Sequence, residues 1–230
     1  MKRMITIVVI LLLGFLLAAC EPAKTDDRVG EIIDFGGYSW RILEVKDGAA
    51  LLLCEDIPDA NIYHLYPGDV TWETSFLREC LNGIFLKEFS AQDQARIVAT
   101  TIKNPANLWY GTPGGADTTD KIFLLSLEEV DKYFGDSGDY LRMKRKSFDS
   151  NGNAIENPNG WVFSNSHDRE RVAVVGYAET WWWLRSPGAS GGSAATVNVA
   201  GSVNVSGRDV DTFHPEMGGV RPALWLILED

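Results

Sequence analysis

The residues that could perform acid–base or metal chemistry are spread thinly along this 230-residue chain. Its three histidines, His64, His167 and His214, stand far apart, and none has a second ligand at metal-binding spacing. The sequence contains no zinc-protease helix motif, phosphate-binding loop or nucleophile elbow. Paired carboxylates for a hydrolase could still come from four aspartates in predicted loops and their borders: Asp117, Asp120, Asp209 and Asp211. We therefore expect no metal and no cofactor, and we keep hydrolysis by these carboxylates as an alternative function.

Aromatic and charged side chains in loops offer a second kind of chemistry, which is recognition. Trp109 and Tyr110 stand in a stretch rich in Gly, Pro and Asn, over residues 104–119. Arg208, Asp209 and His214 stand in a polar stretch over residues 208–217. Ligand contacts collect in loops because loops lie on the surface. We take these five residues as candidate ligand contacts, against the alternative that the two aromatic residues only fix their own loop.

Three consecutive tryptophans, Trp181, Trp182 and Trp183, form the most distinctive stretch of the chain. Side chains alternate along a strand, so Trp181 and Trp183 would share one face and Trp182 would take the other. Such a strand must be covered on both sides, and we expect it in the interior of a sheet. We assign Trp181 and Trp183 to the core and keep Trp182 as a sixth candidate contact for a ligand such as a sugar ring.

Arg185 and Arg221 each stand in an apolar run close to a proline. The planar guanidinium group could bind an anionic ligand through two parallel hydrogen bonds. An unpaired charge inside an apolar strand is costly, however. We therefore expect both arginines to be structural and to pair with carboxylates or carbonyl groups at the edge of the core.

The first twenty residues are typical of an export signal. Two basic residues precede an apolar run over residues 5–17, and Leu17-Ala18-Ala19-Cys20 follows. This ending resembles the lipobox of bacterial lipoproteins, which implies cleavage before Cys20 and a lipid on its sulfur. An ordinary signal peptide or a signal anchor is the alternative. We expect a signal peptide over residues 1–19, a lipidated tether over 20–30, and one domain over 31–230.

The remaining cysteines and the composition restrict the protein further. Cys54 and Cys80 could form a disulfide in an exported protein, but two separate buried thiols fit their apolar surroundings equally well. The net charge of −11 argues against a nucleic-acid partner, which would require a basic face. A hydrophobic content of 45% is sufficient for a core in one domain of ordinary size.

The spacing of apolar residues and turn signals predicts a mixture of short strands and helices. We expect strands over residues 32–35, 38–45 and 49–54, with an Asp-Gly turn between the last two. Helices are expected over 76–89 after a Thr74 or Ser75 cap, over about 91–97 after Ser90, and over 127–134 after Ser126. Further strands are expected over 97–102, 120–125 and 220–228, and a hairpin over 196–205. We expect residues 135–160 to form a surface excursion.

Several of these runs occur in the order of a known family. The runs are Tyr38 to Leu43, Ser75 to Arg78, Asp120 to Ser126, Trp182 to Gly188 and Gly219 to Leu224. Together they resemble an uncharacterised domain-of-unknown-function family of exported gut-bacterial proteins. That family is distantly similar to the C-type-lectin-like fold of formylglycine-generating enzymes. The resemblance implies an α+β, C-type-lectin-like fold with small antiparallel sheets, two or three flanking helices and long loops.

The distant resemblance implies a fold but no reaction. Formylglycine-generating enzymes use cysteines in the C-terminal half, and this chain has none after Cys80. Calcium-dependent lectins use short acidic motifs, and Glu156-Asn157-Pro158-Asn159 is similar in composition but carries an extra residue. We therefore do not expect calcium-mediated binding of sugars.

These observations lead to one functional hypothesis and two alternatives. We expect a surface lipoprotein of the bacterial cell envelope, anchored to the membrane by lipid, whose domain faces the extracytoplasmic side. It would bind an extracellular protein or glycan without catalysis. The alternatives are an envelope hydrolase that uses loop carboxylates and a structural envelope protein without a ligand.

Overall fold

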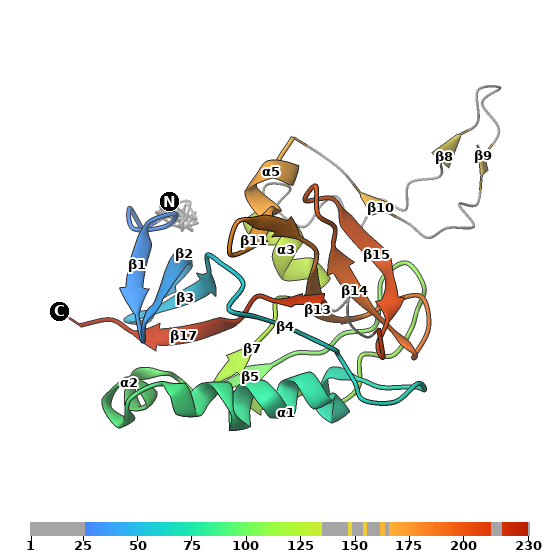
Figure 1. Ribbon diagram of the computed structural model, residues 1–230. Coiled ribbons are helices and arrows are strands. Elements are labelled where there is room, and N and C mark those ends of the chain that lie inside the picture. The colour runs from blue at the N-terminus through green and yellow to red at the C-terminus, as the bar shows by residue number, and fades with distance from the viewer. Residues whose placement is uncertain are drawn as a thin grey trace, which may run out of the picture.

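The computed structural model describes residues 26–134, 147–148, 154–155, 162–163, 166–212 and 218–229. Two larger sheets and several short helices make up these parts of the chain (Figure 1). The architecture is α+β, and its sheets are mostly small and antiparallel. The predicted surface excursion over residues 135–160 falls almost entirely outside the described residues.

The first sheet brings the beginning and the end of the domain together. Its strands are β1 (Ile32–Phe35), β2 (Tyr38–Lys46), β3 (Ala49–Cys54), β17 (Ala223–Ile227) and β7 (Ile122–Phe123), in this spatial order. Every neighbouring pair is antiparallel. Asp47 and Gly48 form the turn between β2 and β3 with φ angles of 51° and 78°, as a tight hairpin turn requires. The last strand, β17, therefore lies between the opening hairpin and β7 (Figure 1).

The second sheet contains the tryptophan strand. Its order is β10 (Val162–Phe163), β15 (Val203–Asp209), β14 (Ser193–Val197), β13 (Trp182–Pro187), β16 (Gly218–Val220) and β4 (Asp59–Asn61). β13 is an interior strand, as the covered tryptophans require, and every one of its residues is buried. The β13–β16 pair is parallel, and the other pairs are antiparallel.

Three two-stranded pairs accompany the larger sheets. They are β5 (Thr100–Ile102) with β6 (Thr118–Asp120), β8 (Ser147–Phe148) with β9 (Ala154–Ile155), and β11 (Ala173–Val175) with β12 (Ala178–Thr180). The apolar run over 120–125 does not form one strand, because β6 ends at Asp120 and β7 covers only two residues. Between the two strands, the side-chain oxygen of Asn82 accepts hydrogen bonds from the backbone amides of Lys121 and Ile122, at 3.0 and 3.2 Å.

Serine caps begin three of the helices. Ser75, Ser90 and Ser126 accept the backbone amide three residues later and precede α1 (Phe76–Gly83), α2 (Ala91–Arg96) and α3 (Leu127–Tyr133). The helix expected over 76–89 is shorter than predicted: α1 ends at Gly83, and the chain continues as the 3-10 helix η2 (Phe85–Glu88). α1 packs beside β7 on one side of the molecule (Figure 1). Two further short helices are η1 (Trp72–Thr74) and α5 (Asp168–Arg171).

Tryptophan side chains occupy much of the core. Trp182 and Trp183 have no exposed surface, and Trp181 is 7% exposed. The rings of Trp181 and Trp183 meet edge to face with centroids 4.8 Å apart, which places them on the same side of β13. The indole N–H of Trp183 donates to the carbonyl oxygen of Asn61 at 2.9 Å and thereby ties β13 to β4.

Candidate functional site

The loop that contains Trp109 and Tyr110 is fixed from within. Asn107 accepts hydrogen bonds from the amides of both aromatic residues, at 2.9 and 3.3 Å. Its side-chain amide donates to the carbonyl oxygens of Pro187 and Val205, at 2.8 and 3.0 Å. Trp109 is 7% exposed and belongs to the core, and Tyr110 packs half-buried against it. The expectation that Trp109 is displayed to a ligand is therefore wrong.

Trp182 is also a core residue rather than a ligand contact. Its side chain is fully buried, and its indole N–H donates to the carbonyl oxygen of Arg171 at 3.0 Å. The guanidinium carbon of Arg221 lies 5.2 Å from the centroid of its ring. A ligand on the surface cannot reach this indole, because protein atoms cover it on both faces.

Two of the remaining predicted contacts, Arg208 and Asp209, are the last residues of β15. The guanidinium carbon of Arg208 lies 4.4 Å from the centroid of the Trp181 ring, so this cation covers the core indole. Asp209 is exposed at the last position of β15. His214 lies outside the described residues. The two larger cavities described below are lined by other residues.

Arg185 joins three segments of the chain. Its side chain is 4% exposed and forms a two-pronged ion pair with Glu129 on α3. The same guanidinium group donates to the carbonyl oxygens of Leu124 and Lys103, at 2.6 and 3.3 Å. Glu129 also accepts the backbone amide of Ser126 at 2.8 Å and so closes the capping box of α3. These contacts use Arg185 and Glu129 to connect β13, α3 and the loop before β6.

Arg221 connects the chain just before β17 to the end of β3 through hydrogen bonds. It is 1% exposed and donates to the carbonyl oxygens of Cys54 and Glu55, at 2.8 and 3.3 Å. The loss of hydration on burial lowers the pKa of Arg221 to about 10, so the group remains charged at neutral pH. The carboxylate of Glu55 lies 3.9 Å away and supplies a counter-charge.

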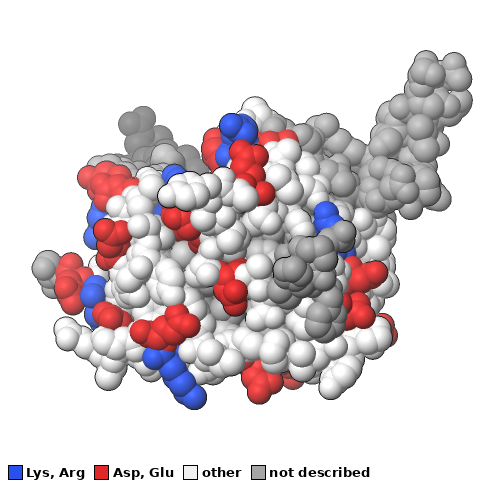
Figure 2. All heavy atoms as spheres, in the orientation of Figure 1, with Lys and Arg blue, Asp and Glu red and all other residues white. Residues whose placement is uncertain are grey.

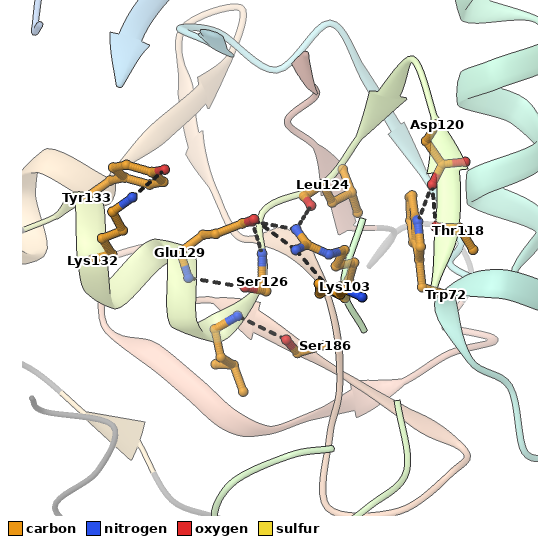
Figure 3. Close-up of polar contacts among 12 residues, drawn as sticks. Trp72, Lys103, Thr118, Asp120, Leu124, Ser126, Glu129, Lys132, Tyr133 and Ser186 are labelled. Carbon is orange, nitrogen blue, oxygen red and sulfur yellow. Dashed lines mark hydrogen bonds and ion pairs between the residues drawn. The ribbon is translucent and has the colours of Figure 1, made fainter. Parts of the chain in front are cut away.

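Asp120 is held by structural contacts, and Figure 3 shows those with Trp72 and Thr118. Its side chain has no exposed surface and accepts hydrogen bonds from Trp72, Thr118 and Arg78, at 2.9, 2.7 and 2.7 Å. A carboxylate with three donors and no access to solvent is not available as a general acid or base. Asp117, in contrast, is exposed, and its hydrogen bond with Lys103 lowers the pKa of the carboxyl group. Among the described residues, no cluster of three or more possible ligands could hold a metal ion.

An open groove of about 290 Å³ runs between α1 and η2 on one side and the β4, β16 and β17 region on the other. We call it the α1 groove. Its apolar lining residues are Pro58, Leu77, Leu81, Ile84, Phe85, Val220 and Pro222, and its polar ones are Tyr38, Asp59, Asn61, Cys80 and Glu88. Figure 2 shows this side of the molecule, where uncharged surface over α1 is interrupted by more acidic than basic patches. A mainly apolar concavity with a few polar groups is the usual form of a binding site.

The polar groups of the α1 groove are acidic or neutral. The hydroxyl of Tyr38 donates to the carboxylate of Glu88 at 2.6 Å, and burial and this bond raise the pKa of Tyr38 to about 12. Burial raises the pKa of the Cys80 thiol, and the negative charges of Glu79 and Asp59 add to this effect. The thiol is therefore protonated at neutral pH and is a poor nucleophile.

The strand at the rim of the groove is closed to further pairing. β4 is the last strand of its sheet. The backbone amides of Ala60 and Ile62 donate to the side chains of Asp59 and Asn61, at 2.8 and 2.9 Å. These side chains occupy amides that an added strand would need, which is a common protection of sheet edges. A ligand in the α1 groove would therefore be recognised through its side chains or functional groups.

A second cavity, of about 280 Å³, lies between the first sheet and the ends of α3 and α5. Its lining includes Arg41, Glu55, Tyr133, Arg169 and Glu170. Arg41 and Glu55 form a two-pronged ion pair, so these two charges compensate each other. This cavity is more polar than the α1 groove and offers less unpaired apolar surface to a ligand.

The sequence did not single out the α1 groove, because its walls come from four separate stretches of the chain. The apolar positions between residues 76 and 89 are Phe76, Leu77, Cys80, Leu81, Ile84, Phe85 and Phe89. Their stripe is wider than one buried helix face requires, and Ile84 is 67% exposed as a result. The width of that stripe was the available signal for a surface that a ligand could cover.

The fold and these sites define an α+β domain in which buried arginines hold main-chain carbonyl groups and an open apolar groove lies beside α1. The chain belongs to the domain-of-unknown-function family DUF6273, whose family model matches residues 47–228. The expected membership of a domain-of-unknown-function family is thus confirmed. No curated protein and no solved structure matches the chain significantly.

Proposed function

We propose that the protein is a lipid-anchored binding module of the bacterial cell envelope that takes its ligand in the α1 groove without catalysis. The observation that carries this proposal is the groove itself. The groove is open and is lined mainly by apolar side chains. It leaves 67% of Ile84 exposed to water, and a ligand that covered this side chain would remove apolar surface from water.

The chemistry of the groove supports binding rather than turnover. Cys80 is protonated at neutral pH, and no histidine or lysine is among the described lining residues to activate it. The phenol of Tyr38 has a pKa of about 12 and is held by Glu88. A general base near pH 7 needs a pKa close to that value, and neither Cys80 nor Tyr38 has one.

A C-type-lectin-like fold is part of this proposal. It is supported by the sequence resemblance and by two features of the architecture. The last strand pairs with the opening hairpin in one sheet, and the second half of the described chain consists mainly of short strands and loops.

Attachment to the membrane would come from Cys20. Among the described residues, no helix is both long and apolar enough to cross a bilayer. The lipobox-like order before Cys20 supports a lipid anchor at the N-terminal end of the chain. β1 and the end of β17 lie on the same side of the molecule (Figure 1).

The anchor is tested by expressing the full chain and Cys20→Ala in a bacterial host that receives labelled palmitate. We expect the parent chain to incorporate label and to partition with membranes. Cys20→Ala should incorporate none and should keep its signal peptide, which mass spectrometry detects. Equal labelling of both chains would refute lipidation at Cys20.

Binding is tested with the full chain in phosphatidylcholine nanodiscs on a glycan array and on a panel of purified envelope proteins. The groove variant is Ile84→Ser, and its matched control is Ile32→Ser, because Ile32 is 53% exposed on β1 and does not line the groove. We expect at least one ligand to bind the parent chain and Ile32→Ser but not Ile84→Ser. Ligands that bind both variants equally would show that the groove is not the site.

A further inference from the structure

We infer that the occupant of the α1 groove is a segment of a partner protein in which an apolar side chain stands next to lysine or arginine. This inference rests on the proposed function, because it specifies the ligand of the same groove. Three features of the groove carry it: the aliphatic wall, the sign of the charges at the rim and the protected edge of β4.

The wall of the groove favours an apolar side chain over a sugar. Half of its lining residues are aliphatic side chains or prolines, and its two aromatic rings, Tyr38 and Phe85, pack against each other with centroids 5.3 Å apart. A sugar ring would bring hydroxyl groups against Leu81 and Ile84, where they would lose water without gaining hydrogen bonds. A leucine-like or aromatic side chain has no hydrogen bonds to lose there, and the transfer of its apolar surface out of water favours binding.

The charges around the groove favour a cationic neighbour. Asp59 and Glu88 are exposed lining residues, and none of the described lining residues is lysine or arginine. Burial raises the pKa of the Cys80 thiol, and the negative charges of Glu79 and Asp59 beside it add to this effect. Complementary charge speeds association and excludes partners of the wrong sign, so an acidic segment would be rejected.

The edge of β4 favours recognition of side chains over the addition of a strand. The amides of Ala60 and Ile62 already donate to Asp59 and Asn61. A partner that added a strand would have to break these two bonds first. The groove thus selects a segment by one inserted side chain and by a cation that meets Asp59 or Glu88 at the rim.

The test uses the full chain in phosphatidylcholine nanodiscs and three labelled twelve-residue peptides, with empty nanodiscs as the blank. The peptides alternate leucine with lysine, leucine with glutamate, and glycine with lysine. Fluorescence anisotropy measures affinity, and protection of Cys80 from a maleimide reports whether the groove is filled. Cys80 is suited to this because it lines the groove and is partly exposed, whereas Cys54 is buried.

We expect the Leu/Lys peptide to bind at least about 10-fold more tightly than either other peptide, which corresponds to about 1.4 kcal/mol. It should also slow the labelling of Cys80. Glu88→Gln should weaken this binding several-fold, whereas Glu128→Gln, which removes an exposed charge outside the groove, should not. Thermal unfolding of both variants at the parent temperature would show that the fold is intact.

Each of the following results would overturn the inference. Equal binding of the Leu/Lys and Leu/Glu peptides would remove the role of charge, and equal binding of the Gly/Lys peptide would remove the role of the apolar side chain. If a glycan or a non-basic envelope protein protects Cys80 and no peptide does, the inference fails while the proposed function stands. If, in addition, no ligand from the glycan array or the envelope panel binds the parent chain more tightly than Ile84→Ser, both the inference and the proposed function fail.

Discussion

The ion pair between Arg185 and Glu129 gives the sharpest test of how this fold is held together. Glu129 has two roles, because it neutralises a guanidinium group that is 4% exposed and it closes the capping box of α3 with Ser126. Glu129→Gln keeps a carbonyl oxygen for the cap and for one bond to Arg185, but it removes the charge. Glu129→Ala removes the charge, the hydrogen bonds and the cap together.

The expected loss of unfolding free energy follows from these two roles. Removing one partner of a buried ion pair costs about 3–5 kcal/mol. The side chain of Glu129 is 26% exposed, so water can partly replace it, and we take the low end of about 3 kcal/mol. Loss of the cap adds about 1 kcal/mol, which gives about 4 kcal/mol for Glu129→Ala. Glu129→Gln should cost about half as much, because a hydrogen bond to a charged group contributes about 1.5–3 kcal/mol.

The assay is equilibrium unfolding in urea, followed by tryptophan fluorescence. With a slope of about 2 kcal/mol per molar urea, Glu129→Ala should lower the midpoint by about 2 M and Glu129→Gln by about 1 M. The control is Glu128→Ala, which removes an exposed carboxylate from the same helical turn and should change stability by less than about 0.5 kcal/mol. If Glu129→Ala and Glu128→Ala shift the midpoint equally, Arg185 does not depend on this counter-charge and our reasoning is wrong.

Three further predictions concern the fixed loop, the thiols and a crowded glycine. Asn107→Ala should destabilise the protein by more than about 2 kcal/mol in the same assay, because several buried backbone groups lose their partner. In native protein, mass spectrometry should find iodoacetamide on Cys80 and not on Cys54. Since the pKa of Cys80 is raised, its rate should keep rising above pH 9, and a plateau below pH 8 would contradict this. Gly201→Ala should lower the melting temperature measured by circular dichroism, because φ is 86° and a Cβ atom would lie 1.8 Å from the carbonyl oxygen of Asp168.

The sequence predicted the local structure best where a short-range physical rule applies. Ser75, Ser90 and Ser126 begin helices because a serine oxygen three residues before an amide is a local arrangement. The Asp47-Gly48 turn and the alternation of tryptophans along β13 are local in the same sense. In each case the deciding contacts lie within a few residues of one another along the chain.

The prediction for Trp109 failed because burial of a loop depends on distant partners. Composition indicated a surface loop, but Asn107 ties the loop to Pro187 and Val205, which lie 80 and 98 residues away in sequence. A hydrogen bond over that separation leaves no periodic signal. The α1 groove was missed for the same reason, since its walls come from residues 38, 58–61, 77–88 and 220–222.

Buried arginines compensate for the shortness of the strands in this fold. A strand of two or three residues leaves many neighbouring carbonyl groups without a partner in a sheet, and each needs a donor when it is buried. Arg185 and Arg221 supply such donors, and Arg171 does the same for the carbonyl oxygens of Gly201 and Phe134, at 2.7 and 3.2 Å. Guanidinium groups are suited to this role because each carries five N–H donors in a rigid plane.

This arrangement also bears on recognition. Arg221 holds the carbonyl oxygens of Cys54 and Glu55 and precedes Pro222, which lines the α1 groove. The groove therefore lies beside a fixed junction, and its β4 wall is tied to β13 through Asn61. A preformed wall lowers the ordering cost of binding, so a small apolar contact contributes a larger share of its burial energy to affinity. None of these buried arginines is among the described residues that line the groove, and the charged residues of that lining, Asp59 and Glu88, are both acidic.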